Sequence, residues 1–151
     1  MRDVLIGMLI GILIGVLMGY YGENFVRPYA PYTFTSTLTL TQSGNATSYT
    51  VGQTITLKAE LDTTIPSELS TFESVLRQYT LNNKPITLFF KMGSSTYWMR
   101  LETKNTFYTL KGETTFTYTF TEANTYIFKA VFGGSNALQP SESLEITFTV
   151  M

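Results

Sequence analysis

The sequence of 151 residues contains no cysteine and no histidine. Without cysteine, the chain forms no disulfide bond and offers no thiolate nucleophile. Without histidine as well, it lacks imidazole general bases and the common zinc-ligand sets. These absences remove the most frequent catalytic and metal-binding side chains, so we expect neither an enzyme nor a bound cofactor. Because the sequence has no cysteine, disulfide bonds give no indication of whether the protein lies in an oxidising or a reducing compartment.

Charge is scarce too, since only 14% of the residues are Asp, Glu, Lys or Arg and the net charge is −1. No basic block is present, so the electrostatic footprint of nucleic-acid binding is missing, and we expect no nucleic-acid partner. Aromatic residues are abundant, with 11 Phe and 10 Tyr, and threonine dominates the polar positions. This composition is typical of β-strands.

The longest uncharged apolar run covers residues 4–21 and has the sequence VLIGMLIGILIGVLMGYY. At about 1.5 Å per residue, roughly 18 residues make a helix about 27 Å long, close to the ~30 Å hydrocarbon thickness of a bilayer. We therefore predict one N-terminal hydrophobic α-helix over residues 1–22, which is either a membrane anchor in contact with the lipid bilayer or the core of a protein filament.

Glycine recurs at every fourth position of this run, at Gly7, Gly11, Gly15 and Gly19. That spacing places the four residues along one face of a helix. Each glycine costs about 1 kcal/mol of helix propensity relative to alanine, and close approach of a second helix is the usual compensation. We expect this face to pack against copies of the same chain.

Two other interpretations of the run stay open. In the first, the glycines only relax a single helix that faces lipid. In the second, the run is a cleaved signal peptide, which requires small residues one and three positions before the cut. Leu17, Tyr20 and Tyr21 occupy candidate positions near its end and disfavour cleavage.

Residues 23–32 form the predicted linker, in which Pro28 and Pro31 keep the chain extended and prevent helix continuation. Its aromatic residues suit a membrane interface, or packing beneath a head domain in a protein assembly. Because a threonine-rich β-domain after a first hydrophobic segment is normally exported, we expect an extracellular location on a cell surface, filament or envelope.

From residue 33 the hydrophobic period changes to two, as in half-buried strands. Alternating segments are predicted at 34–40, 54–61, 86–90, 97–101, 106–110, 115–121, 126–132 and 144–150. About seven to nine short strands, with turns about every ten residues, indicate an antiparallel β-sandwich over residues 33–151. We therefore predict a mainly β fold.

One segment interrupts this alternation. Leu69, Phe72, Leu76 and Tyr79 recur at helical spacing, and the first turn contains Glu68, which the helix dipole favours. The pattern predicts a short helix over residues 67–79, inserted between strands and most simply explained as a cover over one end of the sandwich.

Three strand segments are distinctive: VGQTITL at 51–57, KPITLFF at 84–90 and YIFKAVFGG at 126–134. They resemble, in this order, the opening strand, the third strand, and the penultimate strand with its loop in the Ig-like surface repeats of bacteria and archaea. Ser141-Glu142-Ser143 before the last strand also fits. The resemblance covers residues 33–151, and it departs at Asn124 and in the longer insertion at 64–83. It implies a non-catalytic, extracellular Ig-like module that serves as a spacer, adhesin or assembly unit.

The whole arrangement also resembles archaeal pilins and flagellins, which place an N-terminal hydrophobic helix before a threonine-rich Ig-like domain. That resemblance implies helices bundled in a filament core. The start of this chain, with Arg2 beside Asp3, departs from the processed start of pilin precursors. An unprocessed membrane protein of a virion or envelope fits the start equally well.

Few residues outside the hydrophobic run are candidates for a site. Asn45-Ala46-Thr47 is a sequon in a turn, which makes Asn45 a candidate for N-glycosylation. Exposed aromatics such as Tyr97 and Phe107 are candidates for sugar binding, although packing on a sheet face is the more usual explanation.

The remaining polar motifs predict structure rather than chemistry. The carboxylates are scattered, without a pair spaced for acid–base catalysis, and Glu60 with Asp62 makes only a weak case for Ca²⁺. Gly133-Gly134 is predicted to be a turn and not a phosphate-binding loop, because no helix follows it.

These features favour a non-enzymatic structural subunit of a surface assembly, either a pilus-like filament or a membrane-containing envelope or virion. Its hydrophobic helix would pack against copies of itself as a homo-oligomer, and its Ig-like domain would form the outer surface. The alternative is a singly membrane-anchored Ig-like adhesin or binding module that does not self-assemble.

Overall fold

The computed structural model describes residues 33–46 and 48–151. The predicted helix over residues 1–22 and the linker over 23–32 lie outside the described residues and stay predictions. Contacts separate the chain into a unit that ends at Thr33 and a second unit, Phe34–Met151. Within the described part of the chain, no helix combines the length and hydropathy that crossing a membrane requires.

The second unit consists mainly of strands, as predicted. In chain order, its elements are β1 (Ser36–Gln42), β2 (Ser48–Tyr49), β3 (Thr54–Thr63), the 3₁₀ helix η1 (Ser67–Phe72), α2 (Glu73–Leu81), β4 (Pro85–Met92), β5 (Met99–Asn105), β6 (Phe107–Tyr108), β7 (Gly112–Thr119), β8 (Thr125–Phe132), β9 (Ser141–Glu142) and β10 (Ile146–Val150).

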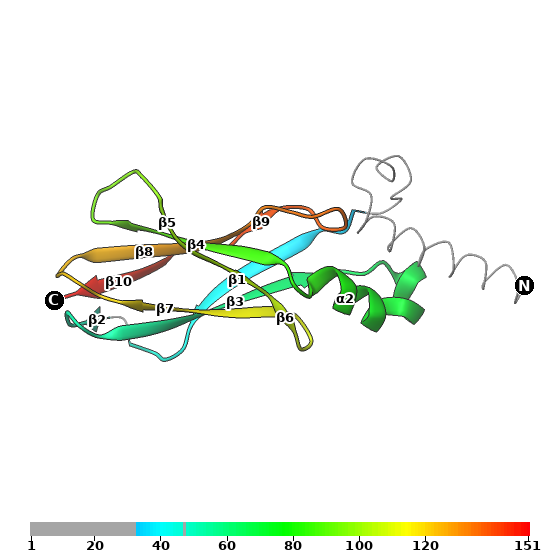
Figure 1. The fold of residues 1–151 in the computed structure, drawn as a ribbon, viewed down its shortest axis with the longest axis horizontal. Coiled ribbons are helices and arrows are strands. Elements are labelled where there is room, and N and C mark those ends of the chain that lie inside the picture. Colours follow the sequence, from blue (N-terminus) through cyan, green and yellow to red (C-terminus); the bar gives the residue numbers. More distant parts are fainter. Residues whose placement is uncertain (1–32, 47) are drawn as a thin grey trace, which may run out of the picture. The chain divides into compact units, whose positions relative to one another are not determined.

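The strands form two sheets that face each other (Figure 1). One sheet has the order β1-β3-β7-β6, and the other has the order β2-β10-β8-β4-β5, with β9 also paired to β8. The pairs are antiparallel except for β2, which runs parallel to β10. Among the described strands, this parallel pair is the exception to the predicted antiparallel pairing. It arises because the chain leaves β1, switches sheets through a short turn, and continues in the direction that β10 also takes.

The strand orders are those of an immunoglobulin-type sandwich. In that nomenclature, the first sheet is A-B-E-D, and β10-β8-β4-β5 is G-F-C-C′. The corner between β7 and β8 carries a second hallmark of this fold. The hydroxyl of Tyr126, at the start of β8, donates to the carbonyl oxygen of Glu122 at 3.2 Å, which is the tyrosine corner of such domains. The predicted Ig-like β-sandwich is therefore confirmed for the described residues.

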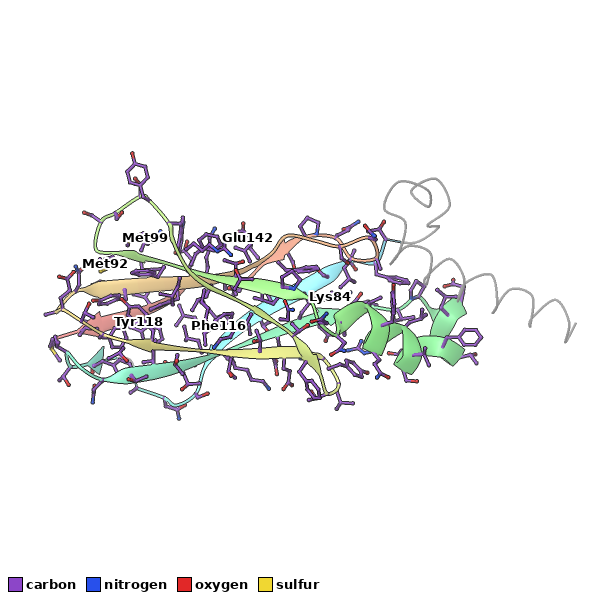
Figure 2. The ribbon with its side chains drawn as sticks, viewed as in Figure 1. Lys84, Met92, Met99, Phe116, Tyr118 and Glu142 are labelled. Carbon is purple, nitrogen blue, oxygen red and sulfur yellow. The ribbon has the colours of Figure 1, made fainter. Side chains whose placement is uncertain are left out.

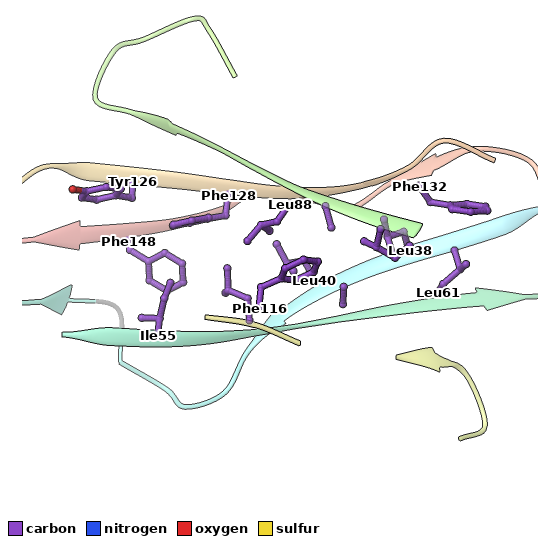
Figure 3. Close-up of a cluster of buried hydrophobic side chains, with 14 of the residues drawn as sticks. Leu38, Leu40, Ile55, Leu61, Leu88, Phe116, Tyr126, Phe128, Phe132 and Phe148 are labelled. Carbon is purple, nitrogen blue, oxygen red and sulfur yellow. The ribbon is translucent and has the colours of Figure 1, made fainter. Parts of the chain in front are cut away.

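The core lies between the two sheets, because alternate residues of each strand point inward. Along β8, Tyr126, Phe128, Ala130 and Phe132 are all fully buried. Figure 3 shows Tyr126, Phe128 and Phe148 of one sheet facing side chains of the other sheet. No buried side-chain nitrogen or oxygen of the described residues lacks a hydrogen-bond partner, so this core carries no desolvation penalty from an unpaired polar side chain.

Aromatic rings fill the end of the core near the C-terminus, which we call the loop end. It contains the β4–β5 loop (93–98) and the β7–β8 turn (120–124), and it lies opposite α2 (Figure 1). Phe120 lies 4.9 Å from Tyr126, and Tyr118 lies 5.2 Å from Phe128, between ring centroids. Burial among these rings raises the pKa of the Tyr118 hydroxyl.

The opposite end, which we call the helical end, carries η1, α2 and the β5–β7 connection. The predicted helix over 67–79 is confirmed as an insertion, but it begins as a 3₁₀ helix and extends to Leu81. Leu76 and Leu81 are buried. After the helix, Asn83 takes a positive φ of 55°, a conformation that asparagine tolerates better than most residues, and the chain turns into β4.

A small polar network joins α2 to the sheets. The buried Thr106 hydroxyl donates to the carbonyl oxygen of Leu81 at 2.5 Å and accepts from the Lys84 N–H at 2.9 Å. Gly112 lies so close to the same carbonyl that a Cβ atom there would be 2.4 Å from the Leu81 oxygen. The end of the helix therefore rests on a position where only glycine fits.

Ion pairs on the outer surface of the same end hold the helix further. Arg77 of α2 bonds to Asp62 of β3 at 2.5 Å and also donates to the carbonyl oxygens of Thr63 and Leu110. Lys84, at the start of β4 beside α2 (Figure 2), has a pKa lowered by burial. The helical end is thus secured by polar contacts in addition to its buried leucines.

Candidate functional site

The β4–β5 loop presents two adjacent aromatic residues on the surface of the sandwich. Tyr97 is 81% exposed, and Trp98 directly follows it. The loop is held at its base, where the Gly93 N–H donates to the carbonyl oxygen of Thr125 at 2.8 Å and the Ser95 N–H donates to that of Met92 at 3.1 Å. These backbone hydrogen bonds fix the start of the loop that carries Tyr97 and Trp98.

Trp98 lies over the outer face of the sheet that contains β4 and β8. Its ring centroid is 4.5 Å from Lys91 Nζ and 4.8 Å from Lys129 Nζ. Strand alternation explains this convergence, because Lys91 on β4 and Lys129 on β8 both point away from the core. The indole is thus held by two cation–π contacts.

Two carboxylates complete this cluster. Glu142 of β9 pairs with Lys129 at 2.9 Å, and Glu145 lies 3.7 Å from Lys91. In Figure 2, the label Glu142 shows where this charged cluster lies, and the labels Met92 and Met99 show the two ends of the β4–β5 loop. An aromatic surface beside ammonium and carboxylate groups offers stacking together with hydrogen-bond donors and acceptors. This chemistry suits a polyhydroxylated ligand or a polar protein surface.

The structure corrects two predictions about aromatic residues. Packing on a sheet face was the favoured explanation for Tyr97 and Phe107, yet both side chains project into solvent, with Phe107 72% exposed. Trp98 was predicted to lie on a strand, but β5 begins one residue later, at Met99. The prediction failed because apolar alternation marks one face of a strand and does not show where the strand begins.

The candidate glycosylation site is accessible. Asn45 is exposed in the turn between β1 and β2, and Gly44 beside it takes a positive φ of 118°. Thr47, the third residue of the sequon, lies outside the described residues. Glycosylation at Asn45 stays a prediction.

The helix-packing residues Gly7, Gly11, Gly15 and Gly19 all lie outside the described residues. Their packing against copies of the chain, and the contact of residues 4–21 with a lipid bilayer, therefore stay predictions.

Glu60 and Asp62, the weak Ca²⁺ candidates, are bound by cations of the protein itself. Lys58 Nζ lies 2.8 Å from Glu60, and Lys111 approaches both carboxylates. The hydrogen bond from Lys58 lowers the pKa of Glu60. In the residues that the structure describes, no three His, Cys, Asp or Glu side chains gather as a metal-binding group.

No family model matches this sequence, and no curated protein is similar to it. Solved structures resemble its fold. A superoxide reductase (neelaredoxin) from Ignicoccus hospitalis has a TM-score of 0.51 at 12% identity, over 77% of this chain and 83% of its own. The CARDB domain of a Pyrococcus furiosus protein has a TM-score of 0.45 at 8% identity, over 80% and 97%. A PKD domain of an M14-like peptidase from a Thermoplasmatales archaeon has a TM-score of 0.37 at 18% identity, over 77% and 95%.

The first of these similarities shows a shared fold alone, and the lower TM-scores of the other two carry no argument. The strand order and the tyrosine corner are what place the described unit among Ig-like β-sandwiches. None of the three brings an activity to this chain.

Proposed function

We propose that the chain is a non-enzymatic structural subunit of an extracellular surface assembly. Residues 4–21 pack against copies of themselves along the face of Gly7, Gly11, Gly15 and Gly19. The Ig-like domain forms the outer surface of a filament or of a membrane-containing envelope.

The packed core of the sandwich is the observation that carries this proposal. Among the described residues, the hydrophobic core is formed by side chains of Phe34 and later residues, so the two sheets bury each other's apolar faces. An uncharged run of this length is costly to expose to water. Lipid or other copies of the run are the environments that remain for it, and the glycine spacing favours copies.

The chemistry of the side chains supports a non-enzymatic role. The sequence holds no His or Cys, and the carboxylates on the face of β3 and β7 are engaged with lysines. A surface made of threonine and paired charges suits the solvent-exposed outside of an assembly.

Glycine substitutions test this proposal directly. We expect Gly11→Leu and Gly15→Leu to abolish ordered assemblies in detergent-free negative-stain electron microscopy, because a leucine side chain keeps two helices apart. Val16→Leu is the matched control and should assemble normally. Near-UV circular dichroism of all variants should match the wild-type spectrum, since the sandwich core is untouched. Normal assembly of both glycine variants would contradict the proposal.

A second function has its own observation, the exposed Tyr97 beside the lysine-held Trp98. This surface favours the alternative, in which a singly anchored module binds a polyhydroxylated ligand such as a glycan. Specific retention of the protein on a glycan array, lost in Tyr97→Ala and kept in Phe107→Ala, would support it. Phe107 is the matched control, because it is also an exposed aromatic residue but lies at the helical end. Equal retention of both variants would argue against this role.

A further inference from the structure

Strand β1 is an unusual edge among the strands that border the two sheets. Exposed edges normally avoid pairing by being short, charged, bulged or covered. Strands β2 and β6 have two residues each. Strand β5 carries Arg100, Glu102 and Lys104 and lies opposite an irregularity of β4. By contrast, β1 has seven residues, STLTLTQ, with no charge, proline or glycine.

The backbone of β1 points hydrogen-bonding groups away from its neighbour β3. At the start of this segment, the Phe34 N–H donates to Ala137 and the Phe34 carbonyl accepts from Gln139, so both groups face away from β3. Because orientation alternates along a strand, the groups of Leu38 and Leu40 face the same way. The odd-numbered residues point their backbone groups the other way, toward β3. The Ser43 N–H, for example, donates to the carbonyl oxygen of Thr56 in β3.

The part of the chain that the structure describes leaves this outward edge open at Leu38 and Leu40, because β1 pairs with β3 alone. The edge is closed only at its start. There, Ser36 Oγ lies 2.6 Å from the carbonyl oxygen of Gln139 and 2.7 Å from Ser141 Oγ.

The sequence of this edge is self-complementary. Residues 37–41 have the sequence TLTLT, which is the same in both directions. When two copies pair antiparallel about Thr39, Leu38 lies opposite Leu40 of the second copy, and Thr39 lies opposite itself. The outward N–H and C=O groups of Leu38 and Leu40 then form the hydrogen-bonded pairs, while threonines meet on the exposed face.

Threonine pairs of this kind already bridge strands within the molecule. Thr54 and Thr119 are hydrogen-bonded at 2.8 Å, and Thr87 and Thr103 at 2.7 Å. Charge makes β5 less suited than β1 to pairing with a second copy of itself. Antiparallel self-pairing of β5 about Glu102 would set Arg100 against Lys104 and Glu102 against itself, and like charges directly opposite each other are destabilising. A second copy therefore fits β1 and is repelled by β5.

We propose that a second copy of this chain adds its β1 to β1, joining two Ig-like domains into one continuous sheet across a twofold axis. This contact goes beyond the packing of residues 4–21 and does not depend on it. It gives neighbouring head domains a defined contact of their own.

Thiol cross-linking of the full chain tests the contact without background, because the sequence has no cysteine. Directly opposed residues of a non-hydrogen-bonded pair have Cα atoms about 4.5 Å apart, within the range of a disulfide. We expect Thr39→Cys to form a covalent dimer under mild oxidation in dilute detergent solution. Two controls are exposed on strands without this contact: Thr117→Cys on β7 and Glu102→Cys on the β5 edge.

We expect Thr39→Cys to cross-link at least about tenfold faster than either control, because a preformed pair raises the effective thiol concentration. Equal rates for Thr39→Cys and Thr117→Cys would overturn the proposal. The same cross-link should persist with Gly11→Leu in the same chain. Its loss there would show that the contact only follows helix packing, and would likewise overturn the proposal.

A charge variant adds a second readout. Thr39→Lys places two ammonium groups opposite each other, so it should remove the dimer of the Gly11→Leu chain in analytical ultracentrifugation. Thr117→Lys should leave that dimer intact. If both lysine variants sediment alike, the β1 contact is wrong, whatever the outcome for the glycines.

Discussion

The two ends of the sandwich are stabilised by different interactions. At the loop end, the ring centroid of Tyr126 lies 4.9 Å from that of Phe120 and 6.5 Å from that of Phe128. At the helical end, α2 is held by hydrogen bonds of Thr106, by ion pairs of Arg77 and by the close approach of Gly112. Burial of the rings is favoured by the non-directional hydrophobic effect, whereas the hydrogen bonds and ion pairs of α2 depend on the position of individual atoms.

This difference indicates where the fold tolerates change. A phenylalanine ring at the loop end can be exchanged for another apolar side chain of similar volume at small cost. At the helical end, we expect an added methyl group at Gly112, or loss of the Thr106 hydroxyl, to disturb a contact with the Leu81 carbonyl oxygen.

The largest effect is expected from Phe128→Ala at the loop end. Phe128 contacts Tyr118 and Phe148 at 5.2 and 5.7 Å between ring centroids. Removing a buried ring leaves a cavity and should lower the free energy of unfolding by about 3–5 kcal/mol, as measured by urea denaturation. Phe107→Ala is the control and should change it by less than about 0.5 kcal/mol, because that ring is exposed. Similar losses for the two variants would contradict the assignment of the core.

An intermediate effect is expected from Gly112→Ala at the helical end. The added Cβ would lie 2.4 Å from the Leu81 carbonyl oxygen, and such crowding typically costs about 1–3 kcal/mol. Hydrogen exchange should accelerate in residues 73–84 more than in β8. Gly133→Ala is the matched control, since open space surrounds that position. A comparable loss in Gly133→Ala would mean that crowding is not the cause.

The smallest effect concerns pH and the charges near the helical end. Hydrogen bonding from Lys58 lowers the folded-state pKa of Glu60 below its ordinary value of 4.5. The resulting stabilisation is complete above pH 4.5 and is lost as pH falls through the lowered pKa. Exposed pairs are worth about 0.2–1 kcal/mol, so Glu60→Gln should reduce the acid-induced loss of stability by this amount in pH-dependent urea titrations. Glu68→Gln, at a position outside these ion pairs, should leave that loss unchanged; an equal reduction would contradict the role of Glu60.

Much of this fold could be predicted from the sequence, because strand alternation and core burial share one cause. The inward residues of β3 and β8 follow a period of two without interruption. The two-residue strands β2 and β9 escaped prediction because they are too short to show a period. The parallel direction of β2 depends on a sheet switch, which no local pattern encodes.

The candidate site was predicted only in part. Tyr97 was recognised as a potential sugar-binding residue, whereas the contact of Trp98 with Lys91 and Lys129 was not. Lys129 lies far from Trp98 in sequence and reaches it only through the pairing of β8 with β4. The sequence alternation does indicate that Lys91 and Lys129 point away from the core. It does not give the β4–β8 register that brings the two lysines together, because that register is set by the tertiary fold.

The parallel pairing of β2 with β10 has a mechanical consequence. The described unit begins at the helical end, where Phe34 bridges to Leu138, and β10 finishes at the opposite end (Figure 1). A pulling force applied between Phe34 and Met151 would slide β2 and β10 past each other lengthwise. Their hydrogen bonds lie across that direction, so they would be loaded together in shear and would not break one after another. We therefore expect tension along the domain to load this short parallel pair in shear.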